Sequence, residues 1–305
     1  MPSVTLTESA KLAQDELVAG VIENVITVNK MYQLLPFDGI DGNSLAYNRE
    51  NVLGDVQVAT VGDTITAKNA ATFTKVNSNL TTILGDAEVN GLIQATRSAT
   101  TDQEATQIAS KAKSAGRQYQ TMLATGDGTG NTFAGLPTLV DASQKVVTGT
   151  NGGALSFAFL DELLDLVVDK DGNVDYITMH SRTIRSYKAL IRALGGVTAD
   201  DVYQMPSGET VIAYSGVPIF RNDYLATNQV KGSGSAQTTI FAGTLDDGSR
   251  THGIAGLTAA NDAGIVIEDV GIHQSKDEHI TRVKWYCGLA LFSLKGLAAA
   301  DGITN

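Results

Sequence analysis

One long helix is predicted by the stretch Thr101-Asp-Gln-Glu104-Ala-Thr-Gln-Ile-Ala-Ser-Lys-Ala-Lys-Ser-Ala-Gly-Arg-Gln-Tyr-Gln-Thr-Met-Leu-Ala-Thr125. It opens as a capping box, with Thr101 as the N-cap and Glu104 at the third helical position. At 1.5 Å per residue the helix would be about 36 Å long. Many of its inward positions are alanine, so we expect a sheet or a second helix to approach it closely. Its apolar residues recur at helical spacing, at Ala105, Ile108, Ala109, Ala112, Ala115, Tyr119, Met122 and Leu123.

The predicted helix runs into a glycine-rich string, Gly126-Asp-Gly-Thr-Gly-Asn131. Gly126 suits a helix end, because glycine accepts the left-handed conformation found there. A phosphate-binding loop follows a strand and opens a helix, whereas this string follows a helix and lacks the Lys-Ser/Thr end of a P-loop. We interpret the string as a structural turn and keep nucleotide binding as the minor alternative.

On the N-terminal side, residues 43–76 predict a long hairpin whose tip, residues 51–68, is polar and rich in small residues. A hairpin that cannot bury its own faces needs a neighbour. Residues 1–40 predict an extended arm carrying one helix that Thr7 would cap. Residues 73–89 have apolar side chains spaced as in one twisted strand.

On the C-terminal side the pattern alternates between helices and strands, which suggests an α/β or α+β subdomain followed by a hairpin. Residues 231–235, Lys-Gly-Ser-Gly-Ser, predict a mobile loop. The expected helices are residues 157–168 and 182–194, and the expected strands are residues 176–179, 209–214, 217–220, 238–241, 264–273 and 280–291.

Composition excludes several classes of protein. The 305 residues include 33 acidic and 22 basic ones, a formal net charge of −11, which disfavours a dedicated nucleic-acid binder. The single cysteine, Cys287, excludes a disulfide framework and a cysteine-cluster metal site. The longest apolar stretch, residues 285–300, is broken by Lys295 and is too short for a membrane span. No basic region precedes an apolar core near the N-terminus, so we expect a protein made in a reducing compartment.

No catalytic, cofactor-binding or metal-ligating residue is predicted. Residues 169–175 resemble the start of a calcium loop, but Val174 stands where glycine is needed and His180 where a bidentate glutamate belongs. His273 and His279 flank one predicted turn, without the spacing of a zinc site. Cys287 lies in an apolar run and is expected in the core.

The order of these elements resembles a tailed-bacteriophage major capsid protein of the Hong Kong 97-type fold. The most telling string is Leu123-Ala-Thr-Gly126-Asp-Gly-Thr-Gly-Asn-Thr-Phe-Ala-Gly135-Leu136, similar to the "L-x-G-D-G … G-L/I" stretch where the family's spine helix meets its A-domain. Residues 176–190 resemble the family's strand followed by a helix, and residues 216–225 its "G-x-P-V … D" strand. Residues 279–291 resemble the strand that returns to the P-domain.

The resemblance implies an α+β fold with an N-terminal arm at residues 1–42 and an E-loop at residues 43–76. The P-domain would comprise residues 77–130 and 261–305, including the spine helix at about 101–125. The A-domain would comprise residues 131–260.

The resemblance also implies a function. One sequence would form pentamers and hexamers that close into an icosahedral phage head, assembled in the host cytoplasm and enclosing weakly contacted double-stranded DNA. A separate scaffolding protein and a portal would be partners, with decoration proteins as further candidates. Lys68 lies near the hairpin tip, but no asparagine partner or assisting acid can be matched, so covalent crosslinking is not predicted. The alternatives are an encapsulin-like compartment shell and a small nucleotide-using enzyme.

Overall fold

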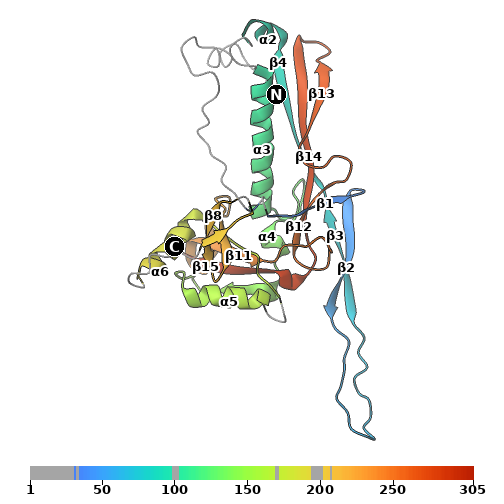
Figure 1. Cartoon of the computed structure of the whole chain (residues 1–305), viewed down its shortest axis with the longest axis vertical. Helices are drawn as coiled ribbons and strands as arrows, with labels where there is room; N and C mark the ends of the chain where they lie inside the picture. Colours follow the sequence, from blue (N-terminus) through green and yellow to red (C-terminus); the bar gives the residue numbers. More distant parts are fainter. Residues whose placement is uncertain (1–30, 32–33, 98–102, 169–171, 194–201, 207) are drawn as a thin grey trace.

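The computed structural model describes residues 31, 34–97, 103–168, 172–193, 202–206 and 208–305. The described chain is elongated, with a long helix and long strands at one end, a globular part beside their base, and a thin ribbon projecting away (Figure 1). The predicted helix with Thr7 as its cap, the cap residue Thr101 and the start of the calcium-like string lie outside the described residues.

The long strands form a five-stranded sheet in which β1, β12, β14 and β13 are paired in that order. Strand β4 also pairs with β14. Ten consecutive residue pairs, from Glu278↔Asn90 to Cys287↔Thr81, join β14 to β4 in antiparallel register. The strands are β1 (Phe37–Ile40), β4 (Thr81–Asn90), β12 (Ile254–Ala259), β13 (Val266–Ile272) and β14 (Glu278–Leu291).

Helix α3 (Gln103–Thr125) packs on β4 and β14. At the base of the helix, the fully buried ring of Tyr119 stacks on Trp285 with centroids 4.7 Å apart, and Phe37 and Phe133 pack against the same ring. The Tyr119 hydroxyl donates to the carbonyl of Gly288 at 3.3 Å. The long helix predicted from the sequence is therefore confirmed as far as it is described.

A second sheet forms the globular part, in the order β5-β15-β11-β6-β9-β8-β7 with β10 paired to β11. Its apolar core includes helices α5 and α6. The strands are β5 (Lys145–Val147), β6 (Tyr176–Met179), β7 (Val202–Gln204), β8 (Thr210–Tyr214), β9 (Val217–Arg221), β10 (Gln229–Lys231), β11 (Gly234–Gly243) and β15 (Leu297–Ile303). The remaining helices are α2 (Gly91–Arg97), α4 (Leu136–Leu139), α5 (Phe157–Val168), α6 (Ser181–Ala193) and the 3₁₀ turns η2 (Ala142–Gln144) and η3 (Leu294–Gly296).

One local expectation was wrong, and one expected loop has a defined place in the sheet. The single strand expected at residues 73–89 is two strands, because the chain changes partner at Leu80, whose N–H donates to the carbonyl of Asn43 at 2.9 Å. Residues 231–235, expected to be a mobile loop, include the turn of the β10–β11 hairpin, where Lys231 pairs with Gly234. Gly232 turns this corner with φ of +57°.

Three strands join a different sheet from the one that the predicted domain boundaries gave them. β15 lies in the globular sheet between β11 and β5, although residues 261–305 were assigned to the long-stranded part. β1 and β12, assigned to the arm and to the globular part, pair with each other in the five-stranded sheet. The small side chains of Ala298 and Ala300 face the core that α5 completes, which suits β15 to a central position.

We predict that Tyr119→Ala lowers the free energy of unfolding of the unassembled chain by about 3–5 kcal/mol, because it removes a fully buried aromatic ring from the contact between α3 and the sheet. Chemical denaturation measures the change. Phe73→Ala is the matched control, since Phe73 is exposed and its truncation should change stability by less than about 0.5 kcal/mol. Equal losses in the two variants would contradict the prediction.

Candidate functional site

The projecting ribbon is the most unusual surface of the described chain. Strands β2 (Ser44–Val52) and β3 (Thr72–Asn79) pair antiparallel with each other, from Ser44↔Asn79 to Val52↔Thr72, and belong to neither larger sheet. The ribbon extends well beyond the rest of the molecule (Figure 1). This is the long hairpin expected from the sequence at residues 43–76.

The root of the ribbon is fixed to the end of β14. The Tyr47 hydroxyl and the Arg49 guanidinium both donate to the carbonyl of Leu291, at 2.7 and 2.5 Å. Arg49 also donates to the carbonyl of Phe292, and the Tyr47 and Phe292 rings meet edge to face with centroids 5.2 Å apart. Leu45 packs against the small apolar core that contains Phe292. The root is therefore oriented by the folded body.

The outer part of the ribbon has no such support. Val58 and Val61 are fully exposed, although the tip was expected to be polar and rich in small residues. Exposed apolar side chains gathered on one projection mark an interaction surface in a soluble protein. The exposed large apolar residues of the ribbon are Val52, Leu53, Val56, Val58, Val61, Ile65 and Phe73.

Polar groups at the tip bond mainly to one another. The Gln57 side chain accepts from the backbone N–H groups of Thr66 and Ala67 at 2.7 and 3.0 Å. The Asp63 carboxylate accepts from the backbone and the hydroxyl of Thr60, and these hydrogen bonds lower its pKa. Gln57 and Asp63 thus have internal partners, and the exposed aliphatic side chains beside them remain available to contact another molecule.

The glycine string after α3 is a closed turn. The N–H of Gly126 donates to the carbonyl of Met122 at 2.7 Å, and the N–H of Gly135 donates to the carbonyl of Gly126 at 3.0 Å. Hydrogen bonds from Thr129 and Thr132 lower the pKa of Asp127 to about 2. A Cβ atom on Gly126 or Gly135 would collide with backbone carbonyl oxygens. These observations support the structural interpretation of the string.

His273 and His279 do not form a ligand pair. The ring of His279 lies between two carboxylates, with Nδ1 3.0 Å from Glu104 and Nε2 3.1 Å from Asp269. His273 accepts instead from the N–H of Ser275 at 3.1 Å. His279 thus links the start of α3 to β13 and β14.

The other residues singled out in the sequence lie apart from one another. Cys287 is fully buried, and burial raises the pKa of its thiol to about 12, so it belongs to the core as expected. Asp175, from the calcium-like string, accepts the backbone N–H of Leu245 at 2.8 Å. Lys68 is exposed near the ribbon tip.

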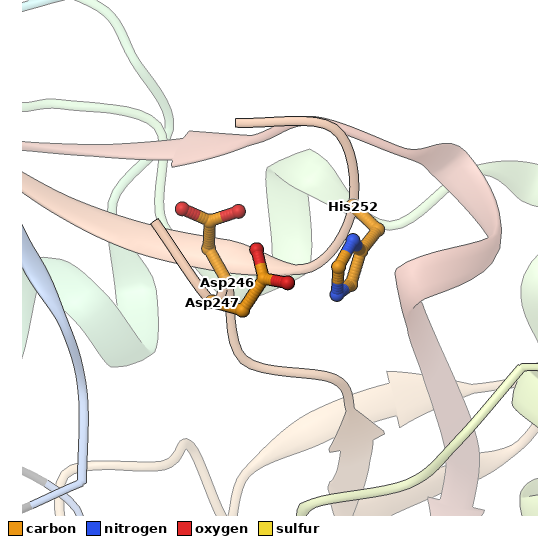
Figure 2. A group of neighbouring side chains, drawn as sticks. All are labelled: Asp246, Asp247 and His252. Carbon is orange, nitrogen blue, oxygen red and sulfur yellow. The ribbon is translucent and has the colours of Figure 1, made fainter. Parts of the chain in front are cut away.

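One group of possible metal ligands escaped the sequence analysis. Asp246, Asp247 and His252 lie on the loop between β11 and β12, with one ligand atom from each within 4.8 Å of the others (Figure 2). The buried carboxylate of Asp246 already accepts the backbone N–H groups of Gly248 and Arg250, at 3.0 and 3.1 Å. We therefore infer that the Asp246 carboxylate stabilises this loop. The only signal in the sequence was Asp-Asp followed five residues later by histidine.

A pocket of about 530 Å³ lies between α6 and strands β8 and β9. Its lining combines apolar side chains, such as Ile184, Ile212 and Phe220, with the basic side chains of Arg185, Lys188 and Arg221. Such a pocket suits an anionic partner with an apolar part.

No helix in the described part of the chain is both long and apolar enough to cross a membrane. No protein-family model matches the sequence, and no curated protein matches it.

Solved structures match along the whole chain. The SrpI encapsulin of Synechococcus elongatus aligns with a TM-score of 0.74 at 18% identity, covering 99% of this chain and 97% of that one. The capsid of the native GTA particle gives a TM-score of 0.68 at 10% identity and covers 99% of both chains. The phage G structure of gp27 major capsid proteins with gp26 decoration proteins gives 0.63 at 12% identity, covering 99% of this chain and 100% of the other. These similarities establish the fold and confirm the expected α+β architecture.

We predict that Gly126→Ala destabilises the chain by about 1–3 kcal/mol, because the added Cβ would force the turn after α3 apart. The matched control is Gly116→Ala, at a position inside α3 where a Cβ meets nothing within 4 Å. There alanine should stabilise the helix by about 0.5–1 kcal/mol. Denaturation midpoints measure both, and a Gly126→Ala chain as stable as wild type would contradict the interpretation.

Proposed function

Since its fold is of the Hong Kong 97 type, we propose that this chain is a structural subunit that assembles with copies of itself into a closed shell, and that it is not an enzyme. The observation that carries the proposal is the ribbon, whose root is fixed and whose aliphatic tip is exposed in the single chain. Full-length similarity to an encapsulin and to capsid proteins supports it.

The energetics favour neighbours of the same kind. Burying one exposed valine, leucine or isoleucine side chain stabilises a contact by roughly 1.5–3 kcal/mol. The ribbon carries six such side chains, Val52, Leu53, Val56, Val58, Val61 and Ile65, so its burial by another subunit would contribute substantially even after the entropic cost of association. In a closed symmetric assembly each copy both gives and receives such a contact, so losing one subunit breaks several interfaces at once.

Within this proposal the elements take the roles that the resemblance implied. Residues 43–76 act as an E-loop that lies over a neighbour, and α3 acts as the spine of a P-domain built on the five-stranded sheet. The globular sheet with α5 and α6 acts as the A-domain. Compared with the A-domain expected from the sequence, this unit includes β15 and excludes β12, which lies in the five-stranded sheet. Of the arm, residues 1–42, the part before β1 is proposed to reach another subunit, since β1 itself pairs with β12 of the same chain.

For the cargo we propose double-stranded DNA in a phage head built from pentamers and hexamers. The net charge of −11 supports a wall to which DNA does not adhere strongly. A scaffolding protein, a portal and decoration proteins would be the partners, and the virion the location.

Similarity to the Synechococcus encapsulin supports a second candidate, a compartment shell with a protein cargo. The neighbouring genes distinguish the two candidates. Terminase, portal and scaffold genes would support the phage head, whereas a gene for a tagged peroxidase or ferritin-like enzyme would support the compartment.

We predict that Val56→Ser, Val58→Ser and Val61→Ser together reduce the yield of closed shells at least tenfold, because they remove the apolar surface that a neighbour would bury. Electron microscopy and gel filtration of the expressed chain measure shells against free subunits. The control is Ala59→Ser with Ala70→Ser, which adds hydroxyl groups to the same exposed tip with little loss of apolar area. A wild-type chain that stays monomeric, or a triple variant that assembles as well as the control, would contradict the proposal.

A further inference from the structure

Helix α6 carries four basic residues and no acidic one in a protein whose net charge is −11. Thr183 and Tyr187 are buried against the sheet. Arg185 and Arg192 are exposed and Lys188 is partly exposed, so the bases lie along the solvent side of the helix. Among the described residues, none of these three forms a salt bridge. The basic residues of α6 are Arg182, Arg185, Lys188 and Arg192.

Helix α5 has the opposite composition. Asp161, Glu162 and Asp165 are all exposed, and the helix contains no basic residue. The Asp161 carboxylate accepts a hydrogen bond from the Tyr214 hydroxyl at 2.5 Å. Within the described part of the chain, Glu162 and Asp165 have no cationic partner. The residues of α5 that pack on the sheet are Phe159, Leu160, Leu163, Leu164 and Val167.

The two helices cover different strands of the globular sheet, although the N-terminal end of α5 reaches β8, where Asp161 bonds to Tyr214. Helix α5 packs on β15, β11 and β5, at one end of the strand order. Helix α6 lies toward the other end, where the Tyr187 hydroxyl donates to the carbonyl of Ala213 on β8 at 2.9 Å. Figure 1 shows α5 along the lower edge of the globular part and α6 at its left end. The rings of Phe157 and Tyr187 touch, with centroids 6.2 Å apart, yet no salt bridge joins the described residues of the two helices.

The pocket beside α6 adds apolar complementarity. Arg185 and Lys188 line this pocket together with the apolar side chains of Ile212 and Ile219. On α5 the acidic side chains are followed by Val168, which is 47% exposed. The basic residues of this lining complement acidic side chains, and its apolar residues complement an exposed aliphatic side chain. An acidic helix that ends in an exposed aliphatic residue therefore fits this pocket.

We propose that α6 of one subunit docks against α5 of a neighbouring copy, with Arg185, Lys188 and Arg192 facing Asp161, Glu162 and Asp165. The inference rests on the proposed shell function and names a pair of surfaces that joins subunits within it. Because the two surfaces are different, the contact is heterologous and repeats from copy to copy until a ring closes. Charge complementarity of this kind selects the partner and fixes the register of docking.

The test reverses the charges of each helix in the full-length chain. Arg185→Glu with Lys188→Glu, and separately Glu162→Lys with Asp165→Lys, should each lower the assembled fraction at least tenfold, because like charges would then face each other. The chain carrying all four substitutions should recover to within about threefold of wild type, since the pairs are restored with opposite sign. Sedimentation at 0.15 M salt measures assembly, and circular dichroism shows that each variant is folded. Asp161 is left unchanged because Tyr214 bonds to it.

The outcomes separate this inference from the proposed function. Wild-type shells with unimpaired charge-reversed variants would overturn the α5–α6 contact and leave the shell function standing. A wild-type chain that forms no assembly would overturn both. Folded double variants that fail to assemble and are not rescued by the quadruple variant would overturn the pairing. If Arg185→Glu with Lys188→Glu leaves assembly intact but abolishes salt-sensitive binding to a short DNA duplex, α6 is a nucleic-acid surface and the proposal is wrong.

Discussion

The β2–β3 ribbon is held in a fixed orientation at its root, and the proposed assembly depends on this constraint. Its root is tied to the end of β14 by Tyr47 and Arg49, so its direction is set by the folded body. Its tip lies beyond the two larger sheets and exposes aliphatic side chains such as Val58 and Val61. Apolar surface held in a fixed orientation and left exposed favours association with another molecule. The proposed shell function rests on this geometry.

The ribbon projects from a frame formed by β4, β14 and α3. The ten-pair ladder between β4 and β14, covered by α3 and fixed by Tyr119 and Trp285, connects the ribbon root to the rest of the chain. The glycine turn at Gly126 joins this frame to the globular part with its backbone groups paired. Polar residues at this junction, including Asp127, therefore stabilise the turn.

Patterns that act over short distances made much of the fold predictable. The alanine-rich apolar stripe predicted α3, and alternating helix and strand patterns predicted α5, β6 and α6 nearly to the residue. The hairpin was predicted because its residues lack core anchors. The partner change at Leu80 escaped prediction, since residues 73–89 keep one strand-like spacing while pairing first with β2 and then with β14. Asp246, Asp247 and His252 were missed because only the loop between two strands brings them together.

By itself the sequence determined the order of the elements, the long helix, the unsupported hairpin and the excess of acidic residues, because these are set by neighbours along the chain. The tertiary structure alone decided that β15 enters the globular sheet and that β1 meets β12, since the β5–β15 and β1–β12 pairings each join residues more than a hundred positions apart. It also decided where the acids of α5 and the bases of α6 lie. The strand order of one sheet sets those positions, and strand order depends on long-range hydrogen bonding and burial that no local pattern encodes.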